Sequence, residues 1–108
     1  MTAEEVARIG ATEAGAGAVL IGSEGERERY YPAIVEYDAK AGRFVYDYDL
    51  LVQAFADDFK DSEDPYTDAV EWVDYNVVRS LPYYGDRAPV ILYKNEDGEY
   101  EKEEQNAD

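Results

Sequence analysis

The sequence predicts an α+β fold, in which an antiparallel sheet of three to five strands carries two main helices on one face. Two segments repeat apolar residues at helical spacing, and short runs of β-branched and aromatic residues are bounded by turn residues. The length of 108 residues suits one domain. We therefore assign residues 1–98 to a single α+β domain and residues 99–108 to an acidic, frayed C-terminal tail.

The N-terminal segment predicts a short helix followed by a strand. Thr2 and Glu5 have the spacing of a capping box, and Gly10 can end the helix that they begin. The apolar run Ala18–Ile21 is bounded by glycines, as expected for a short buried strand.

A β-hairpin is predicted in the next part of the chain. Residues 30–37 are rich in aromatic and β-branched side chains. Residues 40–43 have the composition of a turn and lead into a second strand at residues 44–46. Because Pro32 has no N–H to donate, the first strand should begin near a sheet edge or contain a bulge.

The first main helix is predicted over residues 48–59. Asp47 or Asp49 can serve as its N-cap, because a carboxylate accepts hydrogen bonds from the free N–H groups of the first turn. Its expected buried face consists of apolar residues at helical spacing: Leu51, Val52, Phe55 and Phe59.

The clearest helix is predicted to begin at Pro65, which suits the first helical position, with Asp64 as its N-cap. This helix should end before Pro82. Its expected buried stripe consists of Tyr66, Ala69, Val70, Val73 and Val77. A last strand is predicted over Pro89–Tyr93, followed by a hairpin-type turn at residues 95–98.

The formal net charge of −16 is unevenly distributed along the chain. Residues 44–78 contain ten acidic residues and one basic residue, Lys60. The acids of the second main helix fall opposite its apolar stripe, so a folded surface should present them. A surface selected for solubility alone would intersperse both signs, although a merely solvated helix face stays open as an alternative. The candidate partner-binding residues are Asp57, Asp58, Asp61, Glu63, Asp64, Asp68, Glu71 and Asp74.

Several function classes are excluded by composition. The chain has no cysteine and no histidine, which removes thiolate and imidazole metal sites and nucleophile–histidine triads. A calcium loop starting at Asp47 would place Val52 where glycine is required. No apolar run approaches the roughly 20 residues of a membrane span, and the N-terminus lacks the features of a secretion signal. We therefore expect a cytoplasmic protein that is not an enzyme, uses no cofactor or metal, and contacts neither membrane nor nucleic acid directly.

Two stretches of the chain resemble a known group of proteins. Residues 42–52 read GRFVYDYDLLV, and residues 68–85 read DAVEWVDYNVVRSLPYYG, followed by APVILY at residues 88–93. These stretches resemble small acidic proteins of bacterial phages and mobile elements, most of which have no assigned function. The resemblance covers about half of the chain and transfers no catalytic residue. It implies a mobile element inside a bacterial host cell.

Charge and setting together predict an inhibitor of a bacterial defence system. An anti-CRISPR or anti-restriction protein can act as a DNA mimic, filling the basic channel of a CRISPR effector or restriction enzyme. The alternative is a non-catalytic interaction module whose charge serves solubility. Its tyrosine-rich surface would lie around Tyr30, Tyr31, Tyr83 and Tyr84, since tyrosine is favoured at binding hot spots. The oligomeric state is not fixed by the sequence, and a homodimer is left open.

Overall fold

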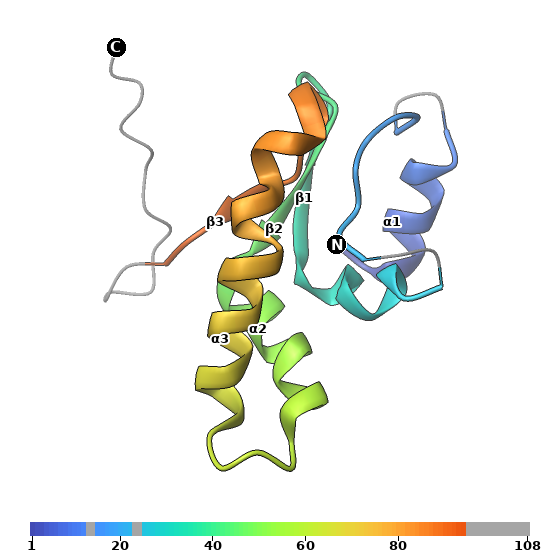
Figure 1. Ribbon diagram of the computed structural model, residues 1–108. Coiled ribbons are helices and arrows are strands. Elements are labelled where there is room, and N and C mark those ends of the chain that lie inside the picture. Colours follow the sequence, from blue (N-terminus) through green and yellow to red (C-terminus); the bar gives the residue numbers. More distant parts are fainter. Residues whose placement is uncertain (13–14, 23–24, 95–108) are drawn as a thin grey trace.

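The computed structural model describes residues 1–12, 15–22 and 25–94 (Figure 1). Within these residues a three-stranded sheet has the order β1–β2–β3. The strands are β1 (Ile34–Asp38), β2 (Arg43–Asp47) and β3 (Val90–Leu92). The predicted α+β class is thus confirmed. The predicted turn at residues 95–98 and the tail at residues 99–108 lie outside the described residues.

The sheet is mixed, which corrects the prediction that all its strands are antiparallel. β1 and β2 form the predicted antiparallel hairpin, but β3 runs parallel to β2. A parallel pair needs a long crossover connection, and here helices provide it. The crossover consists of α2 (Tyr48–Ala56), η2 (Asp57–Phe59), α3 (Pro65–Asn76) and η3 (Val78–Arg87), where η denotes a 3₁₀ helix. Together these helices return the chain to the end of the sheet at which β2 begins (Figure 1).

The three predicted α-helices begin at the predicted caps. α1 (Ala3–Gly10) has the complete capping box between Thr2 and Glu5. Asp47 accepts a hydrogen bond from the Leu50 N–H at 2.9 Å and caps α2. Asp64 caps α3 in the same way, with Pro65 in the first turn. These caps satisfy N–H groups that the helices cannot pair internally.

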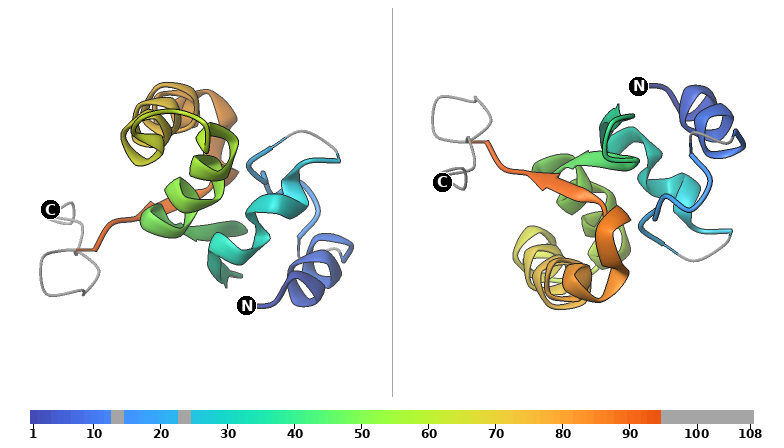
Figure 2. Two further views of the ribbon diagram at one scale, coloured as in Figure 1. Left: turned by 90° about the horizontal axis from the view of Figure 1, so that it is seen from below. Right: turned by 90° about the horizontal axis from the view of Figure 1, so that it is seen from above.

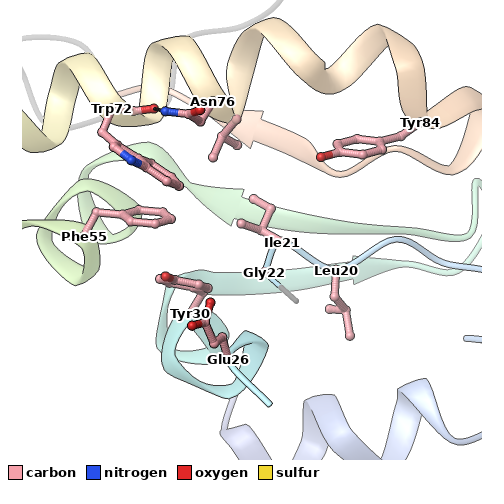
Figure 3. A pocket seen from close by; sticks show the side chains of 10 residues that line it. Leu20, Ile21, Gly22, Glu26, Tyr30, Phe55, Trp72, Asn76 and Tyr84 are labelled. Carbon is pink, nitrogen blue, oxygen red and sulfur yellow. Dashed lines mark hydrogen bonds between the residues drawn. The ribbon is translucent and has the colours of Figure 1, made fainter. Parts of the chain in front are cut away.

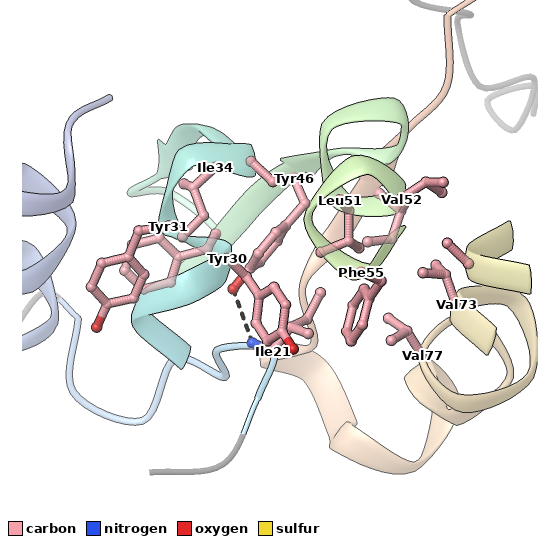
Figure 4. Close-up of a cluster of buried hydrophobic side chains, with 14 of the residues drawn as sticks. Ile21, Tyr30, Tyr31, Ile34, Tyr46, Leu51, Val52, Phe55, Val73 and Val77 are labelled. Carbon is pink, nitrogen blue, oxygen red and sulfur yellow. Dashed lines mark hydrogen bonds between the residues drawn. The ribbon is translucent and has the colours of Figure 1, made fainter. Parts of the chain in front are cut away.

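The core extends from the contact between α2 and α3 across the sheet to η1 (Arg27–Ala33) and α1 (Figure 4). α2 contributes the predicted residues Leu51, Val52 and Phe55, which are all buried, while Phe59 in η2 is partly buried. In α3 the buried core residues are Ala69 and Val73, with Val70 partly buried, and Val77 directly after the helix is buried as well.

Tyr66 does not belong to this stripe, which corrects a second prediction. Its side chain is 53% exposed. Tyr66 lies in the first turn of α3, next to the loop from η2, where Figure 1 shows the helix extending away from the sheet. Helical spacing therefore predicts the correct face of α3. Its first turn, however, extends beyond the part of the helix that packs against the core, so Tyr66 is exposed.

Two segments predicted as strands have other conformations. Ala18–Ile21 pairs with none of the described strands. Residues 30–33 belong to η1 (Arg27–Ala33), and the strand starts directly after it at Ile34. The predicted consequence of Pro32 is confirmed, because β1 is an edge strand and its pairing with β2 is irregular between Ile34 and Glu36.

The segment around Ile21 is held by a side chain of the sheet. The Ile21 N–H donates a hydrogen bond to the Tyr46 hydroxyl at 2.9 Å, drawn as a dashed line in Figure 4. Tyr46 is fully buried in β2. A tyrosine hydroxyl thus satisfies a backbone N–H that lacks a strand partner.

We expect this hydroxyl to make stability sensitive to alkaline pH. Burial raises the pKa of Tyr46 well above its ordinary value of about 10. Its stabilising contribution is therefore complete below about pH 10 and is lost as the pH rises further. Tyr46→Phe should cost about 1–2 kcal/mol at neutral pH, because the Ile21 N–H loses its acceptor.

Urea unfolding at about pH 7, 9 and 11 tests this prediction. Between pH 9 and pH 11 the Tyr46→Phe variant should lose less stability than the unmodified protein. Phenylalanine has no hydroxyl that must stay protonated in the folded state. The other tyrosines titrate in both proteins and cancel in the comparison. Parallel losses in the two proteins would contradict the prediction.

Candidate partner-binding surface

The eight predicted acids lie around the hairpin formed by α2 and α3. Two belong to η2, three to the loop that follows it, and three to α3. We call this set the acidic surface: Asp57, Asp58, Asp61, Glu63, Asp64, Asp68, Glu71 and Asp74. In Figure 1 the loop forms the end of the molecule that points away from the sheet. The fold thus places most of these acids at one extremity.

Four acids of the acidic surface have partners that fix their position. Asp58 forms an ion pair with Arg29 at 2.6 Å. Asp68 accepts a hydrogen bond from the Ser62 hydroxyl. The two others are Asp64, which the Thr67 hydroxyl contacts at 2.7 Å, and Asp74, which the Tyr48 hydroxyl contacts at 2.7 Å. The hydrogen bonds from Thr67 lower the pKa of Asp64, so its carboxylate stays charged at neutral pH.

The other four acids, Asp57, Asp61, Glu63 and Glu71, are exposed and have no hydrogen bond or ion pair with a described residue. Each can therefore meet a positively charged group without first giving up a partner. The Asp58 charge, in contrast, is already compensated by Arg29. Asp74 lies against the start of α2, where it holds Tyr48. The acidic surface thus contains a free part and a structural part, a distinction that sequence spacing does not make.

The structure divides the alternative, tyrosine-rich surface. Tyr30 and Tyr31 are 3% and 7% exposed, so they cannot form an interface with Tyr83 and Tyr84. Tyr30 is buried because its ring stacks on Phe55 with centroids 4.4 Å apart. Tyr83 and Tyr84 in η3 are exposed, as predicted. Of the predicted tyrosine-rich surface, only the rings of Tyr83 and Tyr84 are available to a partner.

Two further exposed rings lie on α3 beside the acids. Trp72 is 39% exposed and Tyr75 is 66% exposed. Tyr75 falls nearly opposite the buried residue Val73 at helical spacing, so the pattern that located the acids could also have located Tyr75, whereas Trp72 falls at the flank of the buried stripe. The outer face of α3 therefore combines negative charge with aromatic surface.

A pocket of about 400 Å³ separates the segment 20–22 and η1 from α3 and η3. Figure 3 shows Phe55 between Trp72 and Tyr30, with Tyr84 across the pocket. Centroid distances of 4.4 Å join both ring pairs of this stack. Because both faces of Phe55 are covered, its ring can offer only an edge to the pocket.

A second, shallow hollow of about 380 Å³ lies on the outer face of α3, and we call it the α3 hollow. Its walls are three rings, two carboxylates and one amide: Phe59, Trp72, Tyr75, Asp68, Glu71 and Asn76. The guanidinium of Arg79 lies over the Tyr75 ring, 4.8 Å from its centroid. The α3 hollow thus joins two acids of the acidic surface to the exposed rings.

The described part of the chain contains neither a metal site nor a membrane-spanning helix. Among residues 1–12, 15–22 and 25–94, no cluster of acidic side chains has an arrangement that could hold a metal ion. None of the helices in the same part of the chain combines the length and apolar character needed to cross a bilayer. The acidic surface and the α3 hollow are therefore the features from which a function can be inferred.

Comparison with known proteins assigns no family. No family model matches the chain, and no curated protein or solved structure is significantly similar to it. The function is therefore inferred from the surface chemistry described above.

Proposed function

We propose that the protein is a non-catalytic inhibitor that occupies the basic nucleic-acid-binding channel of a bacterial defence protein, acting as an acidic mimic of DNA. The observation that carries this proposal is the acidic surface, which has four exposed carboxylates with no partner among the described residues and a single lysine, Lys60, in its stretch of chain. Such a surface attracts a channel lined with lysine and arginine and repels nucleic acid.

The spacing of the acids is of the same order as that of DNA phosphates, although the two spacings are not matched. Carboxylates three or four residues apart on a helix repeat about every 4.5–6 Å, and phosphates of one DNA strand repeat about every 3.4 Å of axis. Part of the array is fixed before binding, because Thr67 holds Asp64 and Ser62 holds Asp68. Fixed charges lose less conformational entropy when a partner binds.

We choose the target from the phage and mobile-element setting that residues 42–93 suggest by resemblance. Counter-defence proteins act in the cytoplasm of the bacterial host, where CRISPR effectors and restriction enzymes present positively charged channels. These two classes are therefore the first targets to test. A second candidate function, an interaction module, is favoured by the exposure of Tyr83 and Tyr84.

Affinity capture followed by competition tests the proposal. The tagged full-length protein is incubated with bacterial lysate at about 0.1 M salt, and bound proteins are eluted stepwise up to about 0.5 M and identified. We expect a nucleic-acid-binding protein that elutes steeply in this range and loses labelled duplex DNA when the acidic protein is added. A partner that stays bound at 0.5 M, or that binds DNA at the same time, would refute mimicry.

The same assay separates the two candidate functions. The double variant Tyr83→Ala/Tyr84→Ala should keep its partner if the acidic surface is the binding site. If this variant releases the partner and neutralisation of the acids does not, the interaction module is correct.

A further inference from the structure

We propose that the α3 hollow binds the guanidinium group of an arginine side chain. That this arginine belongs to a basic partner protein rests on the proposed function. The affinity of the hollow for a guanidinium does not. The hollow supplies two kinds of contact that a guanidinium uses, an aromatic face for stacking and carboxylates for charge-assisted hydrogen bonds. Its volume of about 380 Å³ lies within the usual range of ligand pockets, about 300–1,000 Å³.

The aromatic contact comes mainly from Trp72. One face of its indole is covered by Phe55, whose centroid is 4.4 Å away, and Figure 3 shows the two rings facing each other. Since Trp72 is nevertheless 39% exposed and lines the hollow, the uncovered part of its ring is available to a ligand. Tryptophan is the aromatic side chain that binds cations best, and arginine is the commoner cation in such pairs.

The carboxylates come from Asp68 and Glu71, which are three residues apart in α3. The Ser62 hydroxyl holds Asp68 in place, while exposed Glu71 has no hydrogen bond or ion pair with a described residue. Residues three apart on a helix are neighbours on its surface. A guanidinium stacked on Trp72 can therefore donate to carboxylates of the same helix face.

The chain itself shows that a guanidinium suits this face. Arg79 lies over the Tyr75 ring at 4.8 Å from its centroid, although Tyr75 is 66% exposed. Arg79 thus places one positive charge at the border of the hollow. It should repel an incoming arginine, so removing its charge should strengthen binding.

The larger pocket in Figure 3 is a poorer site for a cation. Phe55 lies between Trp72 and Tyr30, so this stack turns ring edges toward the pocket. The edge of an aromatic ring carries partial positive charge, whereas its face is negative. A cation is therefore expected in the α3 hollow.

The single tryptophan of the chain makes this proposal testable without a partner. In a ¹H–¹⁵N correlation spectrum of the full-length protein, the Trp72 indole gives one signal. We expect Nα-acetylarginine amide to shift this signal in a saturable manner at millimolar concentration. Nα-acetylcitrulline amide, a neutral analogue of almost the same shape, should shift it less than one fifth as far at equal concentration and ionic strength. Equal shifts with the two compounds, or no saturable shift with arginine, would overturn the proposal.

Charge variants with matched controls test the location. Glu71→Gln should weaken arginine amide binding about threefold, and Arg79→Gln should strengthen it about twofold. Glu4→Gln and Arg8→Gln make the same charge changes on exposed residues of α1, which lies across the molecule from α3 in Figures 1 and 2. These two controls should change binding by less than 1.3-fold. If the α1 variants have the same effects as the α3 variants, the cation is only attracted by net charge, and the proposed site is wrong.

The outcomes of the two experiments distinguish failure of the arginine site from failure of the proposed function. A saturable arginine signal without any captured DNA-binding protein would support the hollow and refute the DNA mimic. Capture of such a protein, combined with equal responses to arginine and citrulline, would support the mimic and refute the hollow.

Discussion

Replacing Gly42 with alanine is expected to lower the free energy of unfolding by about 3 kcal/mol. Gly42 has φ of +70° in the turn between β1 and β2, a conformation that costs a residue with a Cβ about 1–2 kcal/mol. A Cβ atom at this position would also lie only 2.6 Å from Nε and Nη2 of Arg87. Arg87 would have to move and lose hydrogen bonds worth about 1–2 kcal/mol in total.

The expected loss is large because Arg87 joins three parts of the fold. Its Nε donates to the Gly42 carbonyl at 2.9 Å, and its Nη1 donates to the Ala16 carbonyl. Its Nη2 donates to the Tyr37 hydroxyl at 3.4 Å. One side chain at the end of η3 thus connects the hairpin turn, β1 and the N-terminal segment.

Gly25→Ala is the matched control for this prediction. Gly25 also has a positive φ, +94°, but, apart from its chain neighbours, no described residue has an atom within 4 Å of the position that a Cβ would take. It should therefore show the backbone cost without the collision, about 1–2 kcal/mol. Urea unfolding measures both values, and a Gly42→Ala loss no larger than that of Gly25→Ala would contradict the role given to Arg87.

A double-mutant cycle isolates the collision. In an Arg87→Ala background the Gly42→Ala change should cost about 1–2 kcal/mol, because the group that the new methyl meets is absent. Strict additivity of the two changes would mean that Gly42 acts through its backbone conformation alone.

The helices could be predicted from the sequence because their signals are local. Thr2 with Glu5, Asp47, and Asp64 with Pro65 each mark a helix start within a few residues, and the structure has all three starts. The hairpin is local for the same reason, since its turn lies between its two strands.

Three of the incorrect predictions depend on contacts between distant residues. The direction of β3 is set by the crossover through α2 and α3, which no property of Val90–Leu92 encodes. Ile21 finds its hydrogen-bond partner 25 residues away in Tyr46, so an apolar run that looks like a strand needs no strand neighbour. Tyr30 is buried because Phe55 stacks on it.

The position of the candidate site could be predicted from the sequence, but which of its acids are already paired within the protein could not. Helical spacing located the acids of α3 and could have located Tyr75, but not the exposure of Trp72 at the flank of the buried stripe. Spacing could not show that Arg29 compensates Asp58. Such pairing requires η1 to lie close to η2, and this contact forms only in the folded chain.

Because Asp58 is already compensated, the second large effect is expected from neutralising the four acids that pair with no described residue. A variant that neutralises these four acids should bind the basic partner about 100-fold more weakly. The changes are Asp57→Asn, Asp61→Asn, Glu63→Gln and Glu71→Gln. An exposed charge contact contributes about 0.7 kcal/mol, so four contribute close to 3 kcal/mol, or about two factors of ten in affinity. Thermal stability should not fall, because these side chains accept no hydrogen bond from a described residue and their mutual repulsion is removed.

A second set of four substitutions distinguishes position from net charge. Glu4→Gln, Glu28→Gln, Glu36→Gln and Asp86→Asn also remove four exposed acids and likewise change the formal net charge from −16 to −12. This set should weaken binding less than about fivefold, because long-range attraction between exposed charges is largely screened beyond about 8–10 Å at physiological salt. Equal losses of affinity for the two sets, measured by titration calorimetry at one salt concentration, would show that the partner responds to total charge. A specific fit to the hairpin of α2 and α3 would then be ruled out.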